Sequence, residues 1–146
     1  MTPRRKTFSD RGREDELREI LHRRILTLDG AMGTMLQRRD LTAADFGGAE
    51  LEGCNENLVL TRPDVIREVH EAYFEAGADI AEADTFGSIR HVLAEYGLQD
   101  KVRELNVQAC TVAREAARKY ATKTRPRFVA GALGPGTKAI TVTGGI

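Results

Sequence analysis

ILTLDGAMGT, residues 25–34, is the stretch that decides the fold class. Its short apolar run stops at a loop with two glycines, which is typical of a buried strand followed by a turn. Two further strands are predicted at 78–87 and 128–133, and they run into the loops ADTFG (83–87) and ALGPGT (132–137). The chain therefore has three predicted strands that each end in a glycine-containing loop.

Helical patterns separate these strands. The predicted helices cover residues 13–23, 61–76, 88–96 and 100–119. In the second helix, Thr61 is the expected N-cap, Asp64 completes a capping box and Gly77 ends the helix. Its apolar face is expected at Val65, Ile66, Val69, Ala72, Tyr73 and Ala76. Residues 35–60 show little periodicity and predict a long irregular loop. Alternating strands and helices predict an α/β fold with parallel strands and right-handed crossovers.

Composition argues against several classes of partner. Lys+Arg and Asp+Glu are both 22, so the formal net charge is zero and gives no reason to expect nucleic acid or an anionic membrane surface. No apolar run approaches the roughly 20 residues that span a bilayer. The polar, basic N-terminus lacks the apolar segment of a secretory signal. We therefore expect a cytoplasmic protein.

The cysteines and histidines do not predict a metal site. Cys54 and Cys110 are far apart and lack the C-x-x-C spacing of metal ligands. Cys110 falls in a predicted helix, where a small buried hydrophobic residue is expected. His22, His70 and His91 are scattered over predicted helices and are expected at the surface. We expect no metal ligand among them.

The candidate binding residues follow the strands, because the carboxyl ends of parallel strands line the ligand site in α/β folds. Asp29 suits a substrate ammonium group, and the backbone N–H groups of the loop 30–34 suit an anion, so together they fit an amino acid. The alternative is that Asp29 only caps the turn. The loop lacks both G-x-G-x-x-G and the P-loop Lys-Ser/Thr, which argues against a nucleotide.

Asp84-Thr85-Phe86, at the end of the second predicted strand, is a second candidate. Thr85 offers a hydroxyl and Phe86 an apolar wall, although both residues also suit packing at a strand end. Glu82 is a candidate general base, or alternatively the partner of a nearby arginine.

Three stretches together resemble a known family. They are ILTLDGAMGTMLQ (25–37), CNENLVLTRPDVIREVHEAYFEAGADIAEADTFGS (54–88) and FVAGALGPGTK (128–138). In this order they resemble the start of the homocysteine-binding domain of the homocysteine S-methyltransferase family, and within it the cobalamin-dependent methionine synthases. The similarity runs from about Ile25 to Lys138, which is most of the chain.

The resemblance implies a fold and a reaction. The family fold is a (β/α)8 barrel, of which this chain would supply the N-terminal portion, about three β/α units. Residues 1–23 would form a tail and a helix, and residues 24–146 a partial barrel truncated at its C-terminus. The family transfers a methyl group to the homocysteine thiol to form methionine. In the cobalamin-dependent enzymes the donor is methylcobalamin, recharged from 5-methyltetrahydrofolate on later domains.

The resemblance also implies what this chain lacks. A zinc ion bound by cysteines lowers the thiol pKa of homocysteine in the family, and those cysteines lie in motifs on later strands. No catalytic residue, metal ligand or cofactor is therefore assigned to this chain, and residues 1–146 alone are expected to be inactive. The expected partners are homocysteine, the remainder of the barrel, and the cobalamin and folate domains of a parent protein.

By resemblance, ten residues would form part of the homocysteine pocket. They are Asp29, Gly30, Ala31, Met32, Gly33, Thr34, Thr85, Phe86, Gly134 and Pro135. The chain departs from the family in three places. It has Cys54-Asn55 where Asn-Asn is common, Ala83-Asp84 where Thr-Asn is common, and LGPGTK in place of LGPT.

Two other functions remain open on the sequence. One is a fragment of a betaine- or sulfonium-dependent homocysteine methyltransferase. The other is a non-catalytic partial barrel that is completed by a partner chain.

Overall fold

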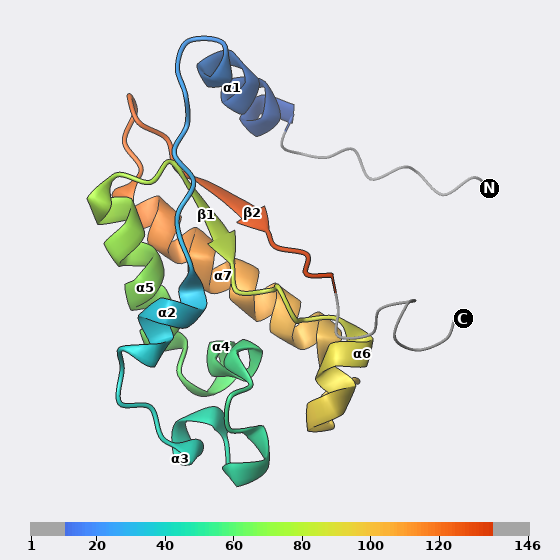
Figure 1. Cartoon of the computed structure of the whole chain (residues 1–146). Helices are drawn as coiled ribbons and strands as arrows, with labels where there is room; N and C mark the ends of the chain where they lie inside the picture. The colour runs from blue at the N-terminus through green and yellow to red at the C-terminus, as the bar shows by residue number, and fades with distance from the viewer. Residues whose placement is uncertain (1–10, 136–146) are drawn as a thin grey trace, which may run out of the picture.

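A computed structural model describes residues 11–135 (Figure 1). Its α-helices are α1 (Arg11–Leu21), α2 (Met32–Gln37), α3 (Ala43–Phe46), α4 (Leu58–Thr61), α5 (Pro63–Ala76), α6 (Arg90–Leu93) and α7 (Val102–Tyr120). Three short 3-10 helices are η1 (Ala49–Leu51), η2 (Asn55–Asn57) and η3 (Ala94–Tyr96). The strands are β1 (Ile80–Ala83) and β2 (Phe128–Gly131). Both strands are shorter than the sequence predicts, because the residues after Ala83 and Gly131 leave the ladder.

The sheet is parallel, as predicted. β1 pairs with β2 in a register that sets Ile80 opposite Phe128 and Ala83 opposite Gly131. On the other side of β1, the predicted first strand forms a single parallel bridge, between Leu28 and Ile80. Ile25 is 90% exposed, so the prediction of a fully buried strand is wrong at this end. The described residues provide no strand or helix that covers it.

Helices α5 and α7 lie side by side and cover one face of the sheet (Figure 1). Their fully buried contact residues include Ile66, Val69 and Phe74 on α5 and Leu105, Ala109 and Val112 on α7. The apolar face predicted for α5 is therefore confirmed at Val65, Ile66 and Val69, whereas Ala72 and Ala76 are exposed. Burial of these side chains, at roughly 25 cal/mol per Å² of apolar surface, holds the helices on the sheet.

The beginning of α5 differs from the prediction. Thr61 is the last residue of α4, and its hydroxyl donates to the carbonyl of Asn57 at 3.2 Å. Arg62 is the N-cap, and its guanidinium binds the carboxylate of Asp64 at 2.8 Å, so no capping box forms there. Gly77 does end the helix, with a φ of +112° that favours glycine.

Residues 35–60 are not an irregular loop. They contain the second half of α2, then α3, η1, η2 and most of α4, each only three to six residues long. The Asn57 side-chain amide donates to the carbonyl of Phe46 at 2.7 Å, and Leu58 and Val59 are fully buried. Elements this short cannot show a helical period, and so the sequence pattern missed them.

Asp79 joins the main segments of the fold. Its carboxylate is 1% exposed and binds the guanidinium of Arg24 through two bonds, of 2.7 and 2.8 Å. It also accepts the backbone N–H of Thr27 at 3.0 Å. The buried Arg127 lies 3.5 Å away and donates to the carbonyl of Ala78 at 2.6 Å. The bond from Arg24 holds the pKa of Asp79 at about 2, so the carboxylate stays charged at neutral pH.

His70 lies in the interior, which contradicts the predicted surface position. It is 0% exposed on the core face of α5, and neither ring nitrogen has a hydrogen-bond partner. Burial lowers the pKa of His70 to about 4, so the ring is neutral at pH 7. His22 and His91 are exposed, as predicted.

Replacing His70 should change how stability depends on pH. The unfolded histidine binds a proton near pH 6.5 and the folded one only near pH 4, so unfolding becomes easier as pH falls between these values. The loss reaches about 3 kcal/mol at most. In His70→Leu this part of the pH dependence should disappear, as thermal unfolding at pH 7 and pH 4.5 would show. An equal loss in both proteins would contradict the assignment.

The open sheet predicts self-association of the chain on its own. Within the described part, nothing pairs with β2 on the side away from β1, and Leu133 beside it is 87% exposed. Unpaired strand edges template association. Purified residues 1–146 should therefore form oligomers or aggregates in size-exclusion chromatography with light scattering. A monodisperse monomer that unfolds cooperatively would show that the edge is covered.

Candidate functional site

A cleft of about 570 Å³ lies at the carboxyl ends of the strands. It is lined by Asp29, Gly30, Ala31, Met32, Gly33, Asn55, Glu56, Glu82, Ala83, Asp84, Phe86 and Ala132. The lining comes from the loop after residue 28, the turn at η2, β1 and the segment after β2. Four of the side chains are carboxylic acids, and no lysine, arginine or histidine lines the cleft within the described residues.

The structure brings most of the predicted site residues to this cleft. Residues 29–33 and Phe86 line it, whereas Thr34, Thr85, Gly134 and Pro135 do not. Thr34 is exposed on α2, and its hydroxyl donates to the carbonyl of Ala31 at 3.3 Å.

Thr85 and Gly134 position the cleft wall. The Thr85 hydroxyl donates to the carbonyl of Ala132 at 2.8 Å and accepts the N–H of the same residue at 3.0 Å. The N–H of Gly134 donates to the carbonyl of Phe86 at 3.0 Å. A Cβ at position 134 would lie 2.6 Å from that oxygen, so only glycine fits. These contacts fix the loop after β2 against the loop after β1. Pro135 is exposed beyond them.

Asp29 lies at the edge between the first segment and β1. Both carboxylate oxygens accept the backbone N–H of Glu82 at 3.1 Å. Burial raises the pKa of Asp29 to about 6, and the hydrogen bond from Glu82 limits the rise. The described residues offer no cation to Asp29, so a cationic ligand group would stabilise its charge. Glu82 itself is exposed, and no arginine pairs with its side chain among the described residues.

Gly30, next to Asp29, packs closely against Tyr73. A Cβ at Gly30 would lie 2.9 Å from the hydroxyl oxygen of Tyr73, which donates to the carbonyl of Ala31 at 3.2 Å. The apolar face of α5 therefore carries the residue that shapes the Asp29 loop.

Glu56 and Asp84 are cleft residues that lie outside the ten predicted pocket residues. The carboxylate of Glu56 accepts the N–H of Gly87 at 3.0 Å, and a side chain at position 87 would collide with it. Asp84 is 7% exposed, and its Oδ2 atom has no hydrogen-bond partner. Burial, together with the charge of Glu56, raises the pKa of Asp84 to about 7. The sequence feature that marks Asp84 is its position directly before Thr85, where the chain departs from the family pattern.

Cys54 lies beside Glu56 but is not a suitable metal ligand. The side chain is 0% exposed and its thiol lies 3.9 Å from the Glu56 carboxylate. Burial raises the pKa of the Cys54 thiol to about 11, so the metal-binding thiolate is disfavoured at neutral pH. Within residues 11–135, no group of three His, Cys, Asp or Glu side chains is arranged to hold a metal ion.

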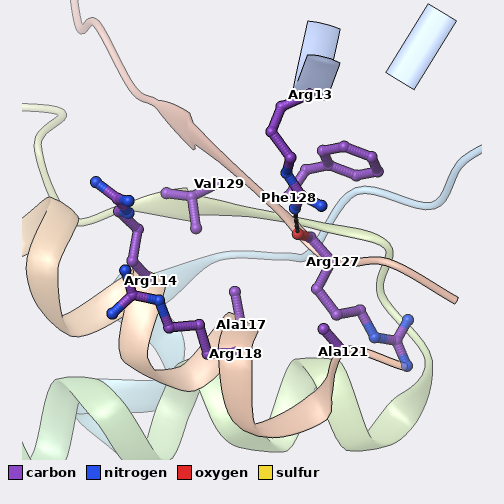
Figure 2. Close-up of a pocket in the computed structure, with 8 residues that line it drawn as sticks. All are labelled: Arg13, Arg114, Ala117, Arg118, Ala121, Arg127, Phe128 and Val129. Atoms are coloured by element: carbon purple, nitrogen blue, oxygen red, sulfur yellow. Dashed lines mark hydrogen bonds between the residues drawn. The ribbon is translucent and has the colours of Figure 1, made fainter. Parts of the chain in front are cut away.

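A second hollow, of about 540 Å³, lies between α1, α7 and β2 and is rich in arginine (Figure 2). Its arginines do not converge on one point. Arg13 donates to the carbonyl of Arg127 at 2.6 Å, while the guanidinium of Arg127 points away to the carbonyls of Ala78 and Phe74. Arg114 and Arg118 point to the opposite side in Figure 2. The hollow therefore offers no assembled anion site.

Comparison with known proteins identifies the family. The sequence profile described as Homocysteine S-methyltransferase matches residues 26–145. The chain belongs to the homocysteine S-methyltransferase family. This confirms the resemblance, and the described β/α units are the N-terminal portion of the family's (β/α)8 barrel, as predicted.

Among relatives of this family, the chain is 46% identical over 129 residues to a methionine synthase of Mycobacterium tuberculosis (strain ATCC 25618 / H37Rv), covering 88% of this chain and 11% of the relative. A methionine synthase of Mycobacterium leprae (strain TN) is also 46% identical, with 88% and 10% covered. The chain therefore spans about a tenth of these relatives.

Solved structures of the same family share the fold. The metallated form of the homocysteine methyltransferase MmuM from Escherichia coli superposes with a TM-score of 0.67 at 30% identity, covering 82% of this chain and 41% of that chain. The oxidised form gives 0.67 at 31% identity, with 81% and 40% covered. No helix in the described part of the chain is long and apolar enough to cross a membrane.

The cysteine geometry predicts that residues 1–146 hold no zinc tightly. A structural zinc site needs several converging thiolate or imidazole ligands, and the described residues offer a single buried, protonated thiol beside the cleft. Metal analysis after dialysis should find far less than one zinc per chain. One retained zinc per chain would show that ligands converge in a way this structure does not contain.

Proposed function

We propose that this chain is part of the homocysteine-binding barrel of a methionine synthase-type enzyme. The enzyme would transfer a methyl group from methylcobalamin, recharged from 5-methyltetrahydrofolate, to the thiol of homocysteine. The 46% identity to two methionine synthases supports this function over a betaine- or sulfonium-dependent methyltransferase. Residues 24–146 would belong to the barrel and residues 1–23 would precede it.

The observation that carries the proposal is the position of Asp29. Its half-buried carboxylate lies in a cleft at the strand ends, without a cationic partner among the described residues. We assign to it the ammonium group of homocysteine. The loop 30–34 offers backbone N–H groups for the substrate carboxylate. Phe86 lines the same cleft, and Thr85, Gly134 and Pro135 belong to the loops that form its wall.

The cofactors of the reaction would be held by other parts of the protein. The described residues do not fit zinc, because the Cys54 thiol is protonated and no third ligand converges with it. We therefore derive no chemical step through a metal in this chain. Its contribution would be to bind and orient the amino-acid end of homocysteine. Two free cysteines without a disulfide are consistent with the cytoplasmic location that we propose.

The substitution Asp29→Asn should weaken homocysteine binding in the complete protein. A charge-assisted contact contributes about 1.5–3 kcal/mol, which corresponds to a rise in Kd of about tenfold or more. Isothermal titration of homocysteine into the wild type and the variant, near pH 7.5, measures the effect. At that pH Asp29 is ionised, because its pKa is about 6.

A matched control is Asp100→Asn, at an exposed carboxylate that lies 3.4 Å from Arg90 and outside the cleft. This control should bind homocysteine like the wild type. Methionine formation from homocysteine with cobalamin and 5-methyltetrahydrofolate tests the wider function. If folded Asp29→Asn binds homocysteine with unchanged affinity, Asp29 does not bind the substrate and only caps the turn. If the wild type does not form methionine, the proposed methyltransferase function is wrong.

A further inference from the structure

Asp84 is buried in the cleft without a partner. It follows β1 directly, lines the cleft, and is 7% exposed. Its Oδ2 atom is fully buried and makes no hydrogen bond. A carboxylate oxygen that is buried without a hydrogen bond has lost its water uncompensated, and this is costly unless a ligand or a proton compensates.

The groups around Asp84 make its charge less favourable still. The charge of Glu56, on η2, repels an ionised Asp84, and the thiol of Cys54 lies near both carboxyl groups. Burial raises the pKa of Tyr96, from η3, and the neighbouring Cys54 and Glu56 add to the rise. Every one of these groups is either neutral or negative. The cleft lining adds two more acids and, among the described residues, no base.

A proton is therefore the compensation that is available to Asp84 before a ligand binds. One carboxyl group of two close neighbours stays protonated when both cannot ionise together. The pKa of Asp84, raised to about 7 by burial and by Glu56, agrees with this geometry. A cationic group that enters the cleft would replace the proton, because it stabilises the ionised form of Asp84.

We propose that Asp84, beside Glu56, is a second carboxyl group of the ammonium subsite and that it releases a proton when a ligand amino group binds. The inference rests on the proposed function, in which homocysteine supplies the ammonium group next to Asp29. In the step, the O–H bond of Asp84 breaks, its proton leaves to solvent, and the carboxylate faces the ammonium group. The subsite thereby selects for an amino-acid substrate over a thiol acid that lacks the amino group.

The pH dependence of binding follows from this exchange. Because binding favours ionised Asp84, homocysteine should bind more tightly as pH rises through 7. Between pH 8 and pH 6 the wild-type Kd should rise by up to about tenfold from Asp84, and by about twofold more from Asp29. A protonated Asp84 that donated to the substrate carboxylate would give the opposite slope.

The test uses isothermal titration of the complete protein with homocysteine in two buffers of different ionisation enthalpy. The thiol proton of homocysteine, which zinc held by the rest of the protein would displace, is lost equally from the wild type and the variant. At pH 7 the wild type should therefore release about half a proton per bound ligand more than Asp84→Asn, which keeps the shape of a neutral carboxyl group and removes the proton. Between pH 8 and pH 6 the Kd of Asp84→Asn should change about tenfold less than the Kd of the wild type.

Two controls separate Asp84 from other causes. Asp100→Asn should match the wild type in proton release and in pH profile. The analogue 4-sulfanylbutanoate, which lacks the amino group, should bind weakly and release the same number of protons from the wild type and from Asp84→Asn. The carboxyl carbon of Asp84, followed by ¹³C NMR in the free protein, should titrate near neutral pH, and Asp84→Asn identifies its signal.

The outcomes are distinct. Proton release that falls by about half a proton in Asp84→Asn supports the inference. Homocysteine binding with equal release in the two proteins, or with an Asp84 carboxyl that titrates below pH 5, overturns it and leaves the proposed function standing. No homocysteine binding by the wild type overturns the proposed function, and the inference with it.

Discussion

The carboxylate of Asp79 ties together three stretches that are distant in the sequence. It binds Arg24 before the first strand-like segment, accepts the N–H of Thr27 within that segment, and lies 3.5 Å from Arg127 at the start of β2. The Asp79 carboxylate is 1% exposed whereas its partner Arg24 is 41% exposed, so solvent weakens this ion pair relative to a fully buried one, and the hydrogen bonds to Asp79 hold the segments together with it. Because the cluster lies at the beginning of the strands, it sets their relative positions for the rest of their length.

The cleft depends on that alignment. With Leu28 fixed opposite Ile80, Asp29 reaches the backbone of Glu82, and the ends of β1 and β2 come level. The four acidic residues of the cleft lie together at the carboxyl ends of the strands. Arg24 and Arg127 lie at the beginning of the strands, where they face Asp79 instead. This separation explains how a chain with no net charge can present a strongly acidic cleft.

The sequence patterns predicted the features that depend on residues close together in the chain. The spacing of Val65, Ile66 and Val69 identified the buried face of α5, and the residues after the first strand identified much of the cleft. Contacts between distant residues left no such pattern. The bond from Arg24 to Asp79 spans 55 positions, and the burial of His70 depends on what packs over α5. Glu56 was hidden for the same reason, because its cleft position follows from the fold of the short helices around it.

The two hydrogen bonds between the Thr85 hydroxyl and the backbone of Ala132, called the latch below, limit which sequence changes the chain can accept in evolution. The hydroxyl of Thr85 contacts only main-chain atoms of residue 132, so those bonds do not depend on which side chain stands there. Substitution at position 132 by any residue except proline, which lacks the N–H, is therefore compatible with the latch. Insertion of one residue between Gly131 and position 132 is not, because it would move the paired N–H and C=O out of reach. The side chain at position 132 can change, whereas its distance along the chain from β2 cannot.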